Sequence, residues 1–158
     1  MGKKIMKKSI LVGSAFETSL RIIVLLNEIK THPLSEQQIS CIDFLSIYGA
    51  DYDLLDENLH GYGIFRFSEY SAKRELIAIS LKKLVLRRLV NFIKTKSGYL
   101  YSLTNEGENV AKRIRDSYSD EYRLAVGVVF NTFPDLNSYL MQKIIFEKSV
   151  KSLEVYDE

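Results

Sequence analysis

Apolar and polar positions follow helical spacing through the first third of the chain. Residues 16–30 are apolar at most positions, which predicts a deeply buried helix that stops before Pro33. A second helix is expected to start at Ser35, because Ser35 and Gln38 can form a capping box, and Gly49 is placed to end it. This second helix has one apolar stripe, formed by Ile39, Ile42, Leu45 and Tyr48.

The spacing changes from helical to alternating in the middle of the chain. The longest helical pattern spans 71–90, and the segments "LVNFIK" and "GYLYSLT" follow it as two strands. Their connection, Thr95-Lys96-Ser97-Gly98, predicts a short hairpin in which glycine adopts a positive φ. Thr104 is placed to cap the next helix, with Gly107 close to its start, and two further helices are expected over 120–133 and 136–150.

This order of elements predicts a mainly α fold with a small β-hairpin, an α+β class. We interpret it as a winged helix followed by a C-terminal helical layer. The expected parts are a flexible basic N-terminal tail over 1–15, a winged-helix core over 16–104, C-terminal helices packed on the core over 105–150, and a frayed tail over 151–158.

Residues 51–67 lack a clear period and predict a long ordered loop, a feature that is often functional. Its carboxylates are crowded and need a positive group nearby, which DNA cannot supply. We therefore predict that a basic protein surface docks here, with the interleaved leucines as the apolar part of the contact. The candidate docking residues are Asp51, Asp53, Leu54, Leu55, Asp56, Glu57 and Leu59. A bound cation is a second interpretation, although the EF-hand pattern is not met.

Positive charge is concentrated around the expected long helix, with eight basic residues and one acidic residue between 71 and 97. At about 100° per residue, Lys73, Lys83 and Arg87 fall in one sector, and Lys94 and Lys96 extend the charge into the wing. These five are candidate contacts to a nucleic-acid backbone. Apolar residues surround most of the same helix, however, and such a helix is usually buried nearly all round. The pattern therefore favours a scaffold or interface role over insertion into a DNA groove.

Reactive groups are sparse. No phosphate-binding loop is present, and the two histidines, His32 and His60, lie far apart and fit no metal-ligand spacing. Cys41 is the single cysteine, and a core residue is the simpler interpretation than a nucleophile. We expect no catalytic residue, no cofactor and no metal. The absence of disulfide potential and of an apolar run of roughly 18 residues favours a cytoplasmic protein without a membrane span.

Three segments together resemble a known family. They are "RIIVLLNEIKTHPLSEQQISCIDFLSIYGADY", "SAKRELIAISLKKLVLRRLVNF" and "GYLYSLTNEG". In this order they resemble the small middle component of ABC-three-component systems, bacterial defence operons that include the Lamassu type. The resemblance covers residues 16–146 and depends most on Arg74-Glu75-Leu76 and on Leu89-Val90 at the end of the long helix.

The resemblance implies a non-catalytic accessory subunit of an anti-phage complex. Its partners would be an SMC-type ATPase and an effector, often a nuclease, from the same operon. The chain would bridge the two and help hold the effector inactive until foreign DNA is sensed, with double-stranded DNA contacted at most through its backbone. The alternative interpretation is a dimeric winged-helix transcription regulator that pairs through its C-terminal helices and binds DNA.

Overall fold

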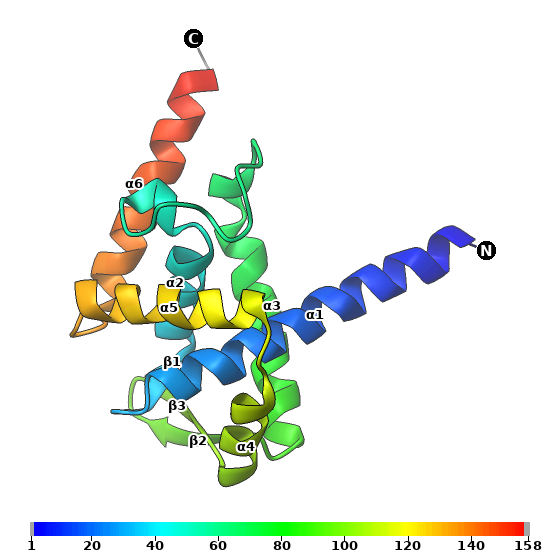
Figure 1. Cartoon of the computed structure of the whole chain (residues 1–158). Coiled ribbons are helices and arrows are strands. Elements are labelled where there is room, and N and C mark those ends of the chain that lie inside the picture. The colour runs from blue at the N-terminus through cyan, green and yellow to red at the C-terminus, as the bar shows by residue number, and fades with distance from the viewer. Residues whose placement is uncertain (1, 157–158) are drawn as a thin grey trace.

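The computed structural model describes the backbone of residues 2–156 and the side chains of residues 15–154. Within these residues the chain is mainly helical with a small antiparallel sheet, so the predicted α+β class is confirmed. Figure 1 shows the arrangement. The elements are α1 (Gly2–Glu28), β1 (Leu34–Ser35), α2 (Glu36–Ile47), α3 (Tyr70–Leu86), β2 (Val90–Thr95), β3 (Gly98–Leu103), α4 (Asn105–Arg113), α5 (Ser117–Thr132) and α6 (Ser138–Tyr156).

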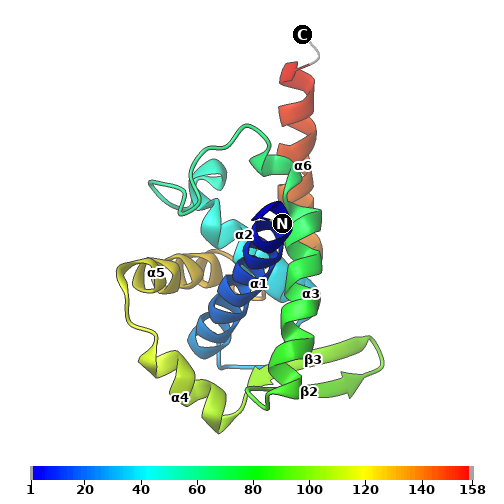
Figure 2. The same cartoon turned by 90° about the vertical axis from the view of Figure 1, so that its right-hand side faces the viewer.

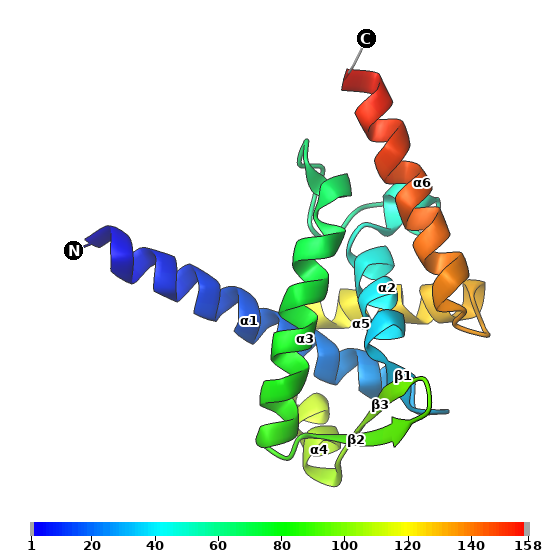
Figure 3. The same cartoon turned by 180° about the vertical axis from the view of Figure 1, so that it is seen from behind.

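α2 is the central helix of the molecule. It packs against α1, α3, α5 and α6, and Figure 3 shows it between α3 and α6 with α5 crossing nearby. Its start is fixed by the predicted capping box, in which the Gln38 backbone N–H donates to Ser35 Oγ and the Ser35 N–H donates to Gln38 Oε1. Every residue from 39 to 47 is buried, so the helix has no polar outer face and the single expected stripe describes only part of its packing.

The sheet has three strands in the order β1-β3-β2. β2 and β3 form the predicted hairpin, in which Thr95 pairs with Gly98 and Gly98 has the expected positive φ of 128°. β1 was not predicted, because it is only two residues long and lies between a proline and a helix cap. Leu34 pairs with Tyr101 and thereby ties the α1–α2 connection to the hairpin.

The Thr104 and Gly107 pair joins the hairpin and α4 to the end of α3. Thr104 caps α4 by accepting from the Gly107 N–H at 3.0 Å, and its hydroxyl donates to the Arg88 carbonyl at 2.8 Å. The Thr104 N–H also donates to the Leu89 carbonyl at 3.1 Å. A Cβ at Gly107 would lie 2.1 Å from the Leu89 carbonyl oxygen, so this close approach of two backbones requires glycine.

The two terminal segments differ from expectation. Residues 2–15, predicted as a tail, form the first half of the continuous helix α1, which extends away from the other elements in Figure 1. Residues 151–156, predicted as frayed, complete α6. Positions 1, 157 and 158 lie outside the described residues. The single 27-residue helix is possible because no proline stands between the basic start and the buried half, although Gly13 lies there.

The long basic helix also differs from expectation. Only one side of α3 is covered, by α1, α2 and the loop before it, and Figure 2 shows the hairpin extending from its C-terminal end. Ile77, Leu81 and Leu84 are buried, whereas Ile79 and Leu86 are 47% and 82% exposed. The domain by itself therefore covers one side of this helix, and burial nearly all round would need a further molecule over Ile79 and Leu86. Within the described residues, every helix is too short or too polar to traverse a membrane.

Candidate functional site

A buried charge cluster lies beside the centre of α2. Arg21 Nε donates to Asp43 Oδ1 at 2.8 Å, and the Tyr122 hydroxyl donates to the same oxygen at 2.7 Å. The three side chains come from α1, α2 and α5, and none is more than 6% exposed. Burial raises the pKa of Asp43, but the charge of Arg21 and the hydrogen bonds from both partners outweigh it and hold the pKa below its ordinary value. Asp43 is therefore an ionised structural carboxylate whose partners are both internal.

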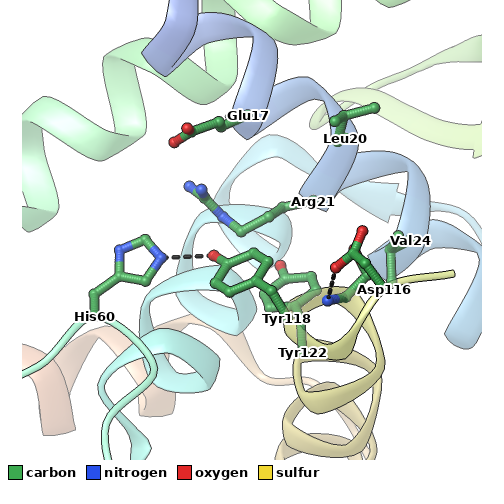
Figure 4. A pocket seen from close by; sticks show the side chains of 9 residues that line it. Glu17, Leu20, Arg21, Val24, His60, Asp116, Tyr118 and Tyr122 are labelled. Atoms are coloured by element: carbon green, nitrogen blue, oxygen red, sulfur yellow. Dashed lines mark hydrogen bonds between the residues drawn. The ribbon is translucent and has the colours of Figure 1, made fainter. Parts of the chain in front are cut away.

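A cavity of about 250 Å³ opens beside this cluster, as Figure 4 shows. α1 contributes Glu17 and Arg21 to its lining, the loop contributes His60, and the start of α5 contributes Asp116 and Tyr118. His60 faces Tyr118 across the opening, with 2.6 Å between Nε2 and the hydroxyl oxygen. The cavity therefore joins three segments that are far apart in sequence, and sequence spacing gave no signal of it.

Two titrating side chains of this cavity, His60 and Tyr118, are neutral near pH 7. Burial, followed by the positive charges of Arg21 and Lys73, lowers the pKa of His60 to about 4. Burial also raises the pKa of Tyr118. A neutral imidazole and a neutral phenol form a stable hydrogen bond, but neither is poised to exchange a proton at neutral pH. The cavity can accommodate a small polar group or a partner side chain.

Cys41 lies in the core, as expected. Its side chain is fully buried, and its sulfur lies 3.4 Å from the Tyr70 hydroxyl oxygen. Burial raises the pKa of the thiol to about 11, which keeps it protonated and unreactive. The described residues also contain no cluster of three histidine, cysteine, aspartate or glutamate side chains that could hold a metal ion.

The acidic loop is organised from within by a basic residue of its own. Arg66 donates from Nε to Asp51 Oδ2 at 2.7 Å and from Nη2 to Asp51 Oδ1 at 2.9 Å. Asn58 adds a hydrogen bond from Nδ2 to Asp51 Oδ2 at 2.9 Å and donates to the Gly61 carbonyl. The positive group that the sequence analysis sought on a partner is, for Asp51, supplied by the loop itself.

The other candidate docking residues divide into two groups. Asp53, Asp56 and Glu57 are exposed, whereas the three leucines are only partly exposed. Leu54 and Leu59 pack against the core, and Leu55 contacts Gly49. The exposed apolar side chains of this loop are instead Tyr62, Ile64 and Phe65, at 54%, 62% and 78%. Their exposure could not be predicted from the sequence, because a loop has no hydrophobic period.

The candidate nucleic-acid contacts are also divided. Lys83, Arg87, Lys94 and Lys96 are exposed. Lys73 is not on the same surface: its side chain is 18% exposed, with Nζ 3.9 Å from a Glu69 carboxylate oxygen. Burial, followed by the positive charge of Arg21, lowers the pKa of Lys73. Ser80, which at about 100° per residue falls between Lys73 and Lys83 on this side of α3, is buried and donates to the Ala15 carbonyl, so the centre of this sector faces α1.

An exposed apolar surface lies where α3 meets the hairpin. We call it the α3–hairpin patch, and it consists of Lys82, Val85, Leu86, Phe92, Tyr99 and Tyr101, which line a shallow groove of about 430 Å³. Leu86 is 82% exposed, and Phe92 and Tyr99 are 53% and 47% exposed with their rings in edge contact. Apolar groups gathered in this way on a surface are typical of protein–protein contacts.

The fold and these surfaces define a small, mainly helical α+β protein whose internal charges are paired with each other and whose apolar groups are partly on the outside. The chain belongs to the family of ABC-three component (ABC-3C) system Middle Component 2, whose sequence model matches residues 11–154. The resemblance to a middle component is thereby confirmed, and membership implies partners within the same ABC-3C system. Neither the curated proteins nor the solved structures include a match to this chain.

Proposed function

We propose that this chain is a cytoplasmic, non-catalytic accessory subunit of a Lamassu-type anti-phage complex. It bridges an SMC-type ATPase and an effector, a nuclease, and holds the effector inactive until foreign DNA is sensed. The observation that carries the proposal is the α3–hairpin patch on a chain of the middle-component family. Leu86, Phe92 and Tyr99 are large apolar side chains exposed to water on one surface. Such a surface is more typical of a protein with a permanent partner than of one that works alone.

We infer that the α1–β3 region is a winged helix used for docking. Its helices and strands follow each other in the order expected of that fold, with a three-stranded sheet at one end. In a DNA-reading winged helix, the third helix enters the major groove with polar and basic groups outward. Here Leu86 is the most exposed apolar side chain of the corresponding helix, and Phe92 and Tyr99 stand beside it on the hairpin. This surface suits an apolar protein partner better than a phosphate backbone.

The acidic loop is the second docking surface in this proposal. Ile64 and Phe65 offer an apolar contact, and the exposed carboxylates of Asp53, Asp56 and Glu57 would guide a basic partner surface to it. The half-buried Leu54, Leu55 and Leu59 would act mainly by holding the loop in shape, together with the Asp51–Arg66 pair. Two surfaces on separate elements are what a subunit between two partners needs.

Co-purification of the three subunits from one operon tests the first surface. The Leu86→Glu variant should reduce recovery of one partner at least tenfold, because a buried contact would gain an unpaired charge. Leu124→Glu is the matched control, since Leu124 is 72% exposed on α5, outside the patch. Equal recovery with both variants would show that the patch is not a docking site.

The loop is tested in the same assay with Phe65→Ser and with Leu59→Ser. Phe65→Ser should weaken co-purification of a partner without lowering the melting temperature of the isolated chain, because Phe65 is 78% exposed. Leu59→Ser should lower the melting temperature, because Leu59 packs against the core. If Phe65→Ser changes neither quantity, the loop does not dock a partner.

A DNA-binding regulator is the second candidate function, supported by the four exposed basic residues Lys83, Arg87, Lys94 and Lys96. Changing Lys83 and Arg87 together to glutamate should weaken binding to all duplexes alike and flatten its salt dependence, if the contacts are to phosphates. A loss confined to one operator sequence would favour the regulator. No detectable duplex binding by the native chain would exclude this function.

A further inference from the structure

The outer face of α6 carries an apolar seam that the described chain leaves mostly open, apart from an edge contact between the Phe146 and Tyr70 rings. Met141 and Ile145 face inward and are fully buried, whereas Tyr139, Phe146, Val150 and Leu153 are 76%, 48%, 55% and 65% exposed. Figures 1 and 3 show that the C-terminal half of α6 projects beyond the other helices. A surface helix normally places polar residues outward, whereas α6 carries large apolar residues on its exposed side as well as on its buried side.

The spacing of these residues matches a helix-pairing seam. Tyr139, Phe146 and Leu153 recur at intervals of seven, and Val150 lies on the same face between the last two. Apolar residues at seven-residue intervals align along one side of a helix and meet a second helix in a coiled coil. Helical segments that project from a domain gain most of their stability from such packing.

The charges that flank the seam indicate what the second helix is. Lys143, Glu147, Lys151 and Glu154 lie on one flank and alternate in sign along the helix. Read in the opposite direction, the same flank has the opposite sign at each position. None of the four has an ion-pair partner among the described residues. A second copy of α6 in antiparallel orientation would therefore set a lysine against a glutamate at every step.

We propose that α6 pairs with α6 of a second copy of this chain, antiparallel, about a two-fold axis near Ser149. Lys143 then lies opposite Glu154 of the other copy, Glu147 lies opposite Lys151, and Phe146 and Val150 pack at the axis. A parallel pair would place this charged flank against the opposite one, which carries Gln142 and Ser149 and cannot complement it. The inference concerns self-association and is independent of the docking surfaces proposed for other subunits.

Sedimentation equilibrium of the purified full chain over a concentration series tests the proposal. A four-residue seam is small, so we expect a reversible dimer with a dissociation constant on the order of 10–100 µM. Val150→Glu should make the chain monomeric, because it places a charge at the axis in both copies. Leu124→Glu, an equally exposed change on α5, should leave the dimer intact.

A charge exchange tests the orientation. Lys143→Glu alone should weaken the dimer at least tenfold, because it sets two glutamates against each other at both ends of the pair. Lys143→Glu combined with Glu154→Lys should restore the native dissociation constant. Circular dichroism of each variant checks that the helices are retained.

Three outcomes would overturn the inference: a native chain that stays monomeric at millimolar concentration, a dimer that Val150→Glu does not disturb, and a double exchange that fails to restore pairing. The first outcome, combined with loss of a partner subunit in the Val150→Glu variant, would assign the seam to that partner instead. The docking proposal is tested by a different assay, the co-purification of subunits with the Leu86→Glu variant. Either proposal can therefore fail without the other.

Discussion

α2 and α3 lie side by side, and the burial of each differs from what its sequence pattern predicts. α2 is more buried than predicted, and α3 is more exposed. α2 carries Ser40, Asp43 and Ser46 and is nevertheless buried on every side. α3 has apolar residues around most of its circumference and nevertheless exposes Ile79 and Leu86. The difference lies in the number of neighbours, because four helices pack around α2 and the elements around α3 leave one side open.

The comparison shows that the two kinds of exception carry different information. A buried polar side chain needs an internal partner, and Asp43 has two, which makes α2 self-sufficient. An exposed apolar face cannot be covered from within the domain, and the open side of α3 is the surface on which we propose that a partner docks. Each of the following experiments tests one side of this contrast.

The largest effect is expected at the buried charge of α2. Asp43→Ala leaves the Arg21 guanidinium buried without its counter-charge and should lower the free energy of unfolding by about 3–5 kcal/mol. Asp120→Ala is the matched control, because Asp120 pairs with Arg123 but is 54% exposed, and it should cost less than about 1 kcal/mol. Urea denaturation measures both, and equal effects would show that burial does not strengthen the Arg21–Asp43 pair.

A pH effect is expected where the two helices meet. His60 lies against Tyr48 at the end of α2, and its pKa is lowered from 6.5 to about 4 by burial and by Arg21 and Lys73. The unfolded chain therefore binds a proton between these values when the folded chain does not. The contribution of His60 to the free energy of unfolding should be fully present above pH 6.5 and be lost as the pH drops to 4. The loss should be smaller than the roughly 3 kcal/mol that the full pKa difference corresponds to, because the side chain is partly exposed and solvent screens its charges.

The variant that isolates this effect is His60→Asn. Its unfolding free energy should vary less with pH than that of the native chain between pH 6.5 and 4. Parallel pH profiles for the native and His60→Asn chains would contradict the assignment. The lowered pKa of Asp43 adds a further loss below its ordinary value of 3.8, as that carboxylate is protonated.

A smaller effect is expected where α3 ends. Gly107→Ala forces a methyl group against the Leu89 carbonyl and should destabilise the chain by about 1–3 kcal/mol. Gly127→Ala, in α5 with open space around it, should be neutral or stabilise by up to about 1 kcal/mol. Thermal melting distinguishes the two, and a Gly107 variant that melts like the native chain would mean that α4 can shift without consequence.

The smallest stability effect is expected on the open side of α3. Leu86→Ser should change the free energy of unfolding by less than about 0.5 kcal/mol, because Leu86 is 82% exposed. Leu84→Ala, two residues earlier on the buried side, should cost about 2–5 kcal/mol. If Leu86→Ser destabilises the isolated chain as Leu84→Ala does, the open side is part of the core and the contrast with α2 fails.

Local features were predictable from the sequence, whereas features that depend on distant segments were not. The Ser35–Gln38 capping box, the hairpin closed at Gly98 and the Thr104 cap each depend on residues within a few positions of one another. The full burial of α2, the Arg21–Asp43–Tyr122 cluster and the cavity at His60 each join segments from separate parts of the chain. A single sequence contains no signal that brings these segments together.

The junction at Thr104 and Gly107 has a consequence for the kinetics and entropy of recognition. Because it ties the end of α3, the hairpin and the start of α4 into one unit, it holds the α3–hairpin patch in one shape in the isolated chain, and in the proposed docking this shape would already be formed when a partner arrives. Little backbone freedom is then lost on association, and more of the contact energy remains as affinity. A variant that loosens this junction should therefore bind a partner more slowly, although no atom of the patch is removed. Gly107, which lies outside the patch, would in this way influence the affinity of the patch for its partner.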